Sequence, residues 1–131
     1  MNLMFKPQYH ERIKAGIKIT TIRGPRREIK IGTRLSLRGW SGKAYRSPQF
    51  VVADAVCTRF TNLFMFRTIV TLADSPDSLM KNADLDAFAI GDGFDDWAGL
   101  VAAFETMYGP GVFPFRGVLI GWNLGTKRSE P

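Results

Sequence analysis

The sequence predicts an α+β fold, namely a small and mostly antiparallel β-barrel flanked by two main helices. Segments with β-branched composition or polar–apolar alternation, both typical of strands, outnumber the segments with helical spacing. Because strands are many and helices few, the sheet is expected to be mainly antiparallel and to curl into a barrel. The chain has 131 residues, 45% of them hydrophobic, which is enough to bury one core.

The expected strands share a high content of Ile, Val, Thr and Phe, or an alternation of polar and apolar residues. They cover residues 17–23, 33–38, 50–60, 63–72 and 115–122. Asn62 is expected at a bend or bulge between two of them. Loops and connections that contain Gly or Pro are expected in the gaps between these strands, over residues 24–32, 39–48 and 73–83.

The two expected helices are defined by different signals. The first runs from Pro7 to Ala15, because proline suits a first helical turn and Gly16 suits a helix end. The second runs from Phe94 to Tyr108, where apolar residues recur every three or four positions and form one continuous stripe.

A tight turn is expected at Gly91, Asp92 and Gly93, directly before the second helix. The sequence leaves two roles open for Asp92. Its side chain caps the helix that follows by accepting a backbone N–H, or it belongs to a polar pocket. The two roles are compatible with each other.

One domain is expected over residues 1–124, followed by a flexible polar tail over residues 125–131. The N-terminal residues do not have the form of a signal peptide, and no apolar run approaches the length of a membrane span. We therefore expect a cytoplasmic protein without a membrane partner. Cys57 is expected in the core, and with His10 as the one histidine we expect no metal and no cofactor. The sequence does not define an oligomeric state.

The net charge of +6 is distributed unevenly along the chain. Residues 1–67 contain 14 Lys and Arg against 3 acidic residues, a net charge of +11. Residues 68–131 contain 4 Lys and Arg against 9 acidic residues, a net charge of −5. Such a local positive field favours a polyanionic partner, and nucleic acid is the partner that we expect. An acidic protein would satisfy the same field.

Basic and aromatic residues are interleaved in the N-terminal half, which predicts contacts with single-stranded RNA or with a nucleotide. Cations contact phosphates, and aromatic rings stack on unpaired bases. The alternative is a solvated basic loop in which Trp40 is buried in the core. The candidate nucleic-acid-binding residues are Arg23, Arg26, Arg27, Arg38, Trp40, Lys43, Tyr45 and Arg46.

The strand at residues 17–23 carries an amine, two hydroxyls and a guanidinium. On a regular strand Thr21 and Arg23 share one face, while Lys18 and Thr20 lie on the other. Lys18 therefore reaches Thr21 only where Lys18 lies in a turn before the strand, or where the strand is bulged or strongly twisted. The run is either a strand with a wet polar face or the wall of a polar pocket.

Three separated segments together resemble the ASCH domain family, one of the groups of PUA-like barrels, over about residues 3–124. The family implies a β-barrel whose cleft is lined by the Lys-Thr-Arg strand and binds RNA or nucleotide-like ligands. The segments are Gly16-x-Lys18-x-x-Thr21-Ile22-Arg23, then Asp92-Gly93-Phe94, and finally Tyr108-Gly109 with Phe115-x-Gly117-x-Leu119-Ile120-x-Trp122.

One branch of this family comprises small amidohydrolases that remove the acetyl group from N4-acetylcytidine. The resemblance implies Lys18 as the base, Thr21 as the nucleophile and Asp92 as an orienting carboxylate. The chain departs from that branch in two places, because it has Ile19 where the branch has threonine, and Asp92 where the branch has glutamate.

Some ASCH proteins are also linked to RNA cleavage. In a metal-independent ribonuclease, Lys18 with Tyr45 or Arg23 would act on the 2′-hydroxyl and phosphate of single-stranded RNA. Binding of RNA or a nucleotide is the function we rank first, because the charge asymmetry supports it directly.

Overall fold

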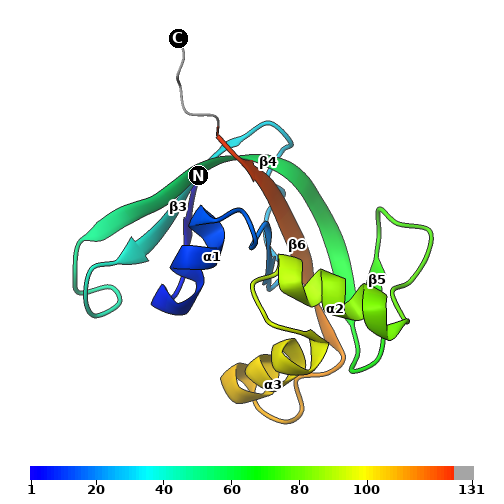
Figure 1. Cartoon of the computed structure of the whole chain (residues 1–131). Helices are drawn as coiled ribbons and strands as arrows, with labels where there is room; N and C mark the ends of the chain where they lie inside the picture. The colour runs from blue at the N-terminus through cyan, green and yellow to red at the C-terminus, as the bar shows by residue number, and fades with distance from the viewer. Residues whose placement is uncertain (126–131) are drawn as a thin grey trace.

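The computed structural model of the chain describes residues 1–125, and these form a mixed α+β fold with one six-stranded sheet and three α-helices (Figure 1). A 3₁₀ turn, η1 (Pro7–Tyr9), precedes the first α-helix. The helices are α1 (His10–Lys14), α2 (Asn82–Gly91) and α3 (Trp97–Tyr108). The strands are β1 (Asn2–Met4), β2 (Thr20–Arg23), β3 (Arg34–Trp40), β4 (Gln49–Met65), β5 (Val70–Leu72) and β6 (Phe115–Leu124).

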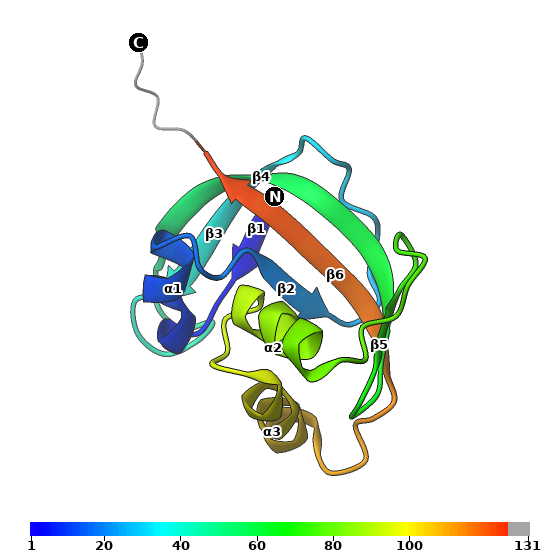
Figure 2. The same ribbon diagram turned by 45° about the vertical axis from the view of Figure 1, so that its right-hand side comes forward.

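The sheet is mostly antiparallel, as expected, but it is not closed into a barrel. Its strand order is β1-β3-β4-β6-β2, with β5 paired to β4, and only the short β1 pairs in parallel. The long strands β4 and β6 curve strongly, so that the edge strands β1 and β2 lie near each other (Figure 2). A side chain spans that gap, because the guanidinium of Arg23 donates to the carbonyl oxygen of Met4 over 2.8 Å.

Both faces of the curved sheet are covered by apolar residues. One cluster, between the sheet and α1, includes Ile13, Leu37 and Trp122, together with Cys57 in its predicted core position. The other cluster lies between the sheet and the helices α2 and α3, and Leu100 is fully buried in it. Trp97, which belongs to the apolar stripe predicted for the second helix, packs against this second cluster but is only half-buried.

Several elements differ from the sequence-based expectation. The expected strands 50–60 and 63–72 are instead the continuous strand β4, which covers 17 residues, and the short β5. β4 is irregular between Cys57 and Arg59, where it pairs with β6, and between Val51 and Ala53, where it pairs with β3, and not at Asn62. A third helix, α2, forms where no helix was expected. α3 begins at Trp97, because the carboxylate of Asp96 caps it by accepting from the backbone N–H of Gly99 over 2.8 Å.

The strand β2 begins three residues later than predicted. Gly16 ends the first helix with a positive φ of 75°, as its identity predicts. The backbone N–H groups of Ile17 and Lys18 then donate to the carbonyl oxygen of Arg12, at 2.9 and 3.0 Å, and so lie outside the sheet. Lys18 therefore lies in the turn that precedes β2.

None of the described helices is both long and apolar enough to cross a membrane. Of the predicted C-terminal tail, residues 126–131 lie outside the described part of the chain.

Candidate functional site

Four polar or charged side chains are buried among residues 1–125, and three of them line one pocket. Lys18, Thr21 and Asp92 line a pocket of about 200 Å³ between β1, β2 and α3, whereas Thr61 lies elsewhere on β4. Burying a charged group is costly unless it is paired and hydrogen-bonded. The clustering of these groups therefore calls for a local explanation.

The end of α2 positions both charged residues. The amino group of Lys18 donates to the carbonyl oxygen of Asp92 over 2.5 Å and to that of Thr20 over 2.7 Å. The backbone N–H of Ile19 donates to the carbonyl oxygen of Gly91 over 2.8 Å. A lysine amine is favourable at a helix C-terminus, where carbonyl groups are left without intrahelical partners. The segment before β2 thus caps α2.

Gly93 allows the close approach of Lys18. Its φ of 100° is a conformation that side-chain-bearing residues rarely adopt. A Cβ at this position would lie 2.7 Å from Cδ of Lys18 and 3.2 Å from Cδ1 of Tyr9. The Asp92-Gly93 pair therefore combines a buried carboxylate with a glycine whose lack of a side chain leaves room for Lys18 and Tyr9.

The carboxylate of Asp92 lies beside the amine of Lys18. Its Oδ1 atom accepts a hydrogen bond from the Thr20 hydroxyl over 2.9 Å and lies 3.8 Å from Nζ of Lys18. Both charged side chains are only 4% exposed. Asp92 does not cap α3, since Asp96 has that role, and so the pocket position is the one that the structure supports.

Burial disfavours the charged forms of Lys18 and Asp92 and so shifts the pKa of each. The pKa of Lys18 is lowered to about 8, because burial disfavours its charge more strongly than Asp92 favours it, and Arg23 adds repulsion. The pKa of Asp92 is raised to about 6, because burial outweighs the effects of Lys18, the Thr20 hydrogen bond and Arg23. Both groups therefore titrate closer to neutral pH than exposed groups do.

Thr21 and Arg23 share one side of β2, as strand alternation predicts. Nε of Arg23 donates to Oγ1 of Thr21 over 3.0 Å, and the guanidinium lies 4.9 Å from the ring centroid of Phe5. Within residues 1–125 no hydrogen bond joins Lys18 to Thr21. Thr20, which the sequence did not single out, contacts both charged residues, because its carbonyl oxygen accepts from the Lys18 amine and its hydroxyl donates to Asp92.

Aromatic rings form the walls above this polar floor. Nζ of Lys18 lies 5.0 Å from the ring centroid of Tyr9 and 5.5 Å from that of Phe5, within range of cation–π attraction. Sequence reasoning missed the wall residues because helical periodicity assigns most of them to a core stripe. They are Phe5, Tyr9, Phe94, Phe104 and Tyr108.

The candidate nucleic-acid-binding residues lie in three separate places. Arg23 is in the pocket, and Arg26 and Arg27 are exposed in the loop between β2 and β3. The remaining five belong to the β3–β4 hairpin and the loop at its end, and they are Arg38, Trp40, Lys43, Tyr45 and Arg46.

The hairpin carries an aromatic pair near its end. The rings of Trp40 and Tyr45 lie 5.1 Å apart, and Tyr45 is 87% exposed. Trp40 is half-buried at the end of β3 and is absent from both core clusters. Tyr45 does not line the pocket that contains Lys18, whereas Arg23 does.

Among residues 1–125 no group of three or more His, Cys, Asp and Glu side chains has an arrangement that could hold a metal ion. The pocket instead offers an amine, a carboxylate, hydroxyls and a guanidinium, which are groups suited to hydrogen bonding and proton transfer.

Comparison of the chain with protein-family models, with curated proteins and with solved structures found no match.

The raised pKa of Asp92 predicts a pH-dependent effect of the Asp92→Asn substitution on stability. The neutral carboxyl stabilises the folded state fully below the ordinary pKa of 3.8, and this contribution is lost as pH rises through about 6. Relative to the parent, the variant should gain stability as pH rises from about 4 to about 7, because the buried carboxyl ionises over this range and the amide does not; urea unfolding would measure the difference.

Asp74 provides a control with the opposite sign. Its pKa is lowered, chiefly by the hydrogen bonds from Arg59, so its charged form stabilises the folded state above pH 3.8. Asp74→Asn should therefore be less stable than the parent at neutral pH. A constant difference between Asp92→Asn and the parent across this pH range would contradict the assignment of a raised pKa to Asp92.

Proposed function

We propose that the pocket binds a nucleobase and that the protein is an RNA- or nucleotide-binding module related to the ASCH domain. The observation that carries the proposal is the buried Lys18–Asp92 pair at the floor of an aromatic pocket. A buried ion pair adds little to stability compared with apolar residues of similar volume, so stability does not account for it. If the protein is related to the PUA-like barrels, its barrel is open between β1 and β2. There the Arg23 side chain connects the two strands in place of backbone hydrogen bonds.

The size and lining of the pocket favour a base over a larger ligand. Its volume of about 200 Å³ lies below the range of about 300–1,000 Å³ that is common for sites holding a whole small molecule. Proteins recognise unpaired bases by stacking on aromatic side chains and by hydrogen bonds to the base edges. The Tyr9 and Phe94 rings supply faces, while Lys18, Thr21 and Asp92 supply donors and acceptors.

The charge distribution favours a ligand with phosphates. The net charge of +11 over residues 1–67 includes Arg23 in the pocket and the exposed Arg26 and Arg27 close to it in sequence. Lys and Arg side chains that neutralise phosphates supply most of the sequence-independent affinity for nucleic acids. Single-stranded RNA is the polymer that we favour, because a pocket of this kind requires an unstacked base.

A nucleoside titration with matched threonine variants tests the pocket. We expect cytidine or uridine to bind, and Thr21→Val to weaken binding about fivefold or more, because it removes a polar group from the pocket floor at nearly constant volume. Isothermal titration calorimetry would measure the affinities.

Thr61→Val is the control, because Thr61 is equally buried but lies outside the pocket. This variant should bind like the parent. The pocket would be refuted as a nucleobase site if neither cytidine nor uridine binds. Equal nucleoside affinities of Thr21→Val and Thr61→Val would refute it too.

A second candidate function is an amidohydrolase that acts on N4-acylated cytidine. The lowered pKa of Lys18 favours it, because a neutral amine is able to accept a proton near physiological pH. Thr21, which the sequence proposes as the nucleophile, accepts from Arg23 and keeps its own hydroxyl proton available for transfer. Thr20 is already hydrogen-bonded to Asp92, which gives the carboxylate an orienting role.

Chromatography of N4-acetylcytidine incubated with the protein tests this second candidate. If Lys18 is the base, release of cytidine should rise with pH up to about 8 and then level off, as the amine loses its proton. Lys18→Met should abolish the reaction, whereas Thr61→Val should retain it. No cytidine at high protein concentration, or a rate that survives Lys18→Met, would exclude this mechanism.

A further inference from the structure

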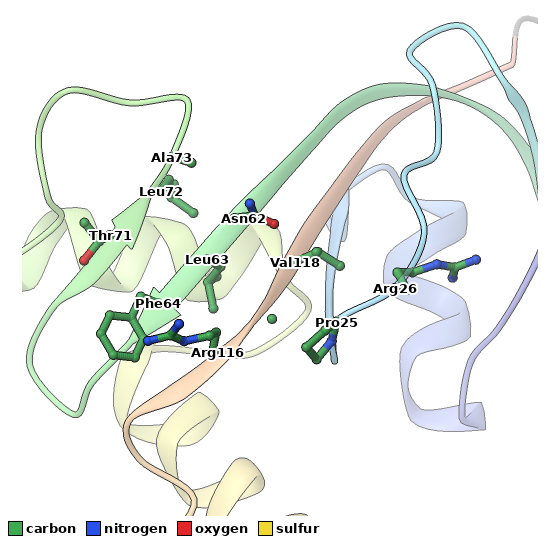
Figure 3. Close-up of a pocket in the computed structure, with 11 residues that line it drawn as sticks. Pro25, Arg26, Asn62, Leu63, Phe64, Thr71, Leu72, Ala73, Arg116 and Val118 are labelled. Carbon is green, nitrogen blue, oxygen red and sulfur yellow. The ribbon is translucent and has the colours of Figure 1, made fainter.

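A second hollow lies on the face of the sheet that carries the Ile13 and Trp122 cluster. It has a volume of about 510 Å³, within the range of about 300–1,000 Å³ common for ligand sites. Figure 3 shows Arg116 beside Phe64 on one side and Arg26 beside Pro25 on the other. We call this hollow the arginine groove, and its principal lining residues are Pro25, Arg26, Asn62, Phe64, Arg116 and Val118.

The register of the sheet makes the arginine groove adjoin the pocket. Arg23 of β2 pairs with Val118 of β6, which pairs in turn with Asn62 of β4. Side chains that are paired across strands lie on the same face of a sheet. Arg23, which lines the pocket, therefore lies beside Val118, which lines the groove. Two residues further along, Arg116 pairs with Phe64 and continues the same face.

The guanidinium of Arg116 lies beside Phe64, whereas that of Arg26 extends away from Pro25 at the edge of the groove (Figure 3). Among residues 1–125, neither Arg26 nor Arg116 forms an ion pair with a carboxylate. The guanidinium of Arg116 lies 4.8 Å from the ring centroid of Phe64, and that of Arg26 lies 3.6 Å from the sulfur of Met1. Both side chains belong to exposed residues.

The acidic residues near the groove do not cancel its positive charge. Glu28 and Asp74 line a neighbouring hollow that also includes Arg26. Asp74 is already held by two hydrogen bonds from Arg59, at 2.7 and 2.8 Å. The lining of the groove itself contains two arginines and no acidic residue.

We propose that the arginine groove binds the nucleotide next to the one whose base enters the pocket, with Arg26 and Arg116 on phosphates and Phe64 under the base. This inference rests on the proposed function, because it extends the path of the same single-stranded RNA. The pocket has room for one base only, so the rest of a strand must lie outside it. The groove is the adjoining surface that combines cations, an aromatic ring and the amide of Asn62.

Salt-dependent binding of a labelled RNA tests the groove. The probe is a fluorescein-labelled single-stranded RNA of about ten nucleotides and mixed sequence, followed by anisotropy between about 50 and 200 mM salt. The slope of log affinity against log salt is negative, and Arg26→Ala and Arg116→Ala should each reduce its magnitude by about 0.7. This is the value for one phosphate contact on a single strand. Phe64→Leu should weaken binding about fivefold or more through loss of stacking.

The matched control for the arginine variants is Arg34→Ala. Arg34 is exposed and pairs with Val56, while its neighbour Leu35 is buried in the cluster that contains Trp122. Because successive side chains of a strand alternate, Arg34 lies on the face of the sheet opposite to the groove. This variant removes one positive charge and should leave the salt slope unchanged. Thermal melts of each variant, and especially of Phe64→Leu, report whether the fold is retained.

Titration of cytidine into the same variants separates the groove from the pocket. Weaker RNA binding with unchanged cytidine binding in Arg26→Ala and Arg116→Ala supports the groove. RNA binding that both variants leave unchanged overturns the groove and does not affect the pocket. RNA binding that depends on the arginines but not on Thr21 supports the groove and refutes the pocket. Failure of both ligands to bind overturns both proposals.

Discussion

The contact between Lys18 and the end of α2 connects the fold to the pocket. The lysine amine donates to the carbonyl oxygen of Asp92 and lies beside the carboxylate of the same residue. These contacts join the turn before β2 to the α2–α3 connection. Burial disfavours the charged form of both groups, which brings their pKa values to about 8 and about 6. Apolar residues of similar volume would serve stability at least as well, and this is the reason for proposing a ligand-binding pocket here.

The open seam between β1 and β2 provides the space for this site. If the two edge strands were joined by a backbone ladder, their hydrogen bonds would occupy the gap where the pocket lies. Instead Arg23 spans the gap to Met4 and also donates to Thr21 on the pocket floor. The same residue neighbours Val118 in the sheet, which connects the pocket to the arginine groove. Arg23 therefore both bridges the two edge strands and lines the pocket.

Local patterns predicted the elements whose signals are local, such as the end of α1 at Gly16 and the apolar stripe of α3. α2 was missed because it buries only Leu85 and Ala89 and so shows no continuous stripe. Lys18, Thr21 and Asp92 were predicted as site residues from motifs, and the structure brings them to one pocket. The partnership of Thr20 with Asp92 was not predictable, because it spans 72 residues and depends on how α2 ends.

The most direct test of the account is an NMR titration of the lysine side-chain amines, with Lys18 assigned through a Lys18→Arg variant. The Lys18 signal should titrate near pH 8 in the free protein, because burial lowers its pKa. Saturating cytidine should change both the midpoint and the chemical shift of Lys18, and should leave the signal of the exposed Lys14 in place. A Lys18 signal that titrates at the ordinary value of 10.5 and does not respond to cytidine would contradict the account.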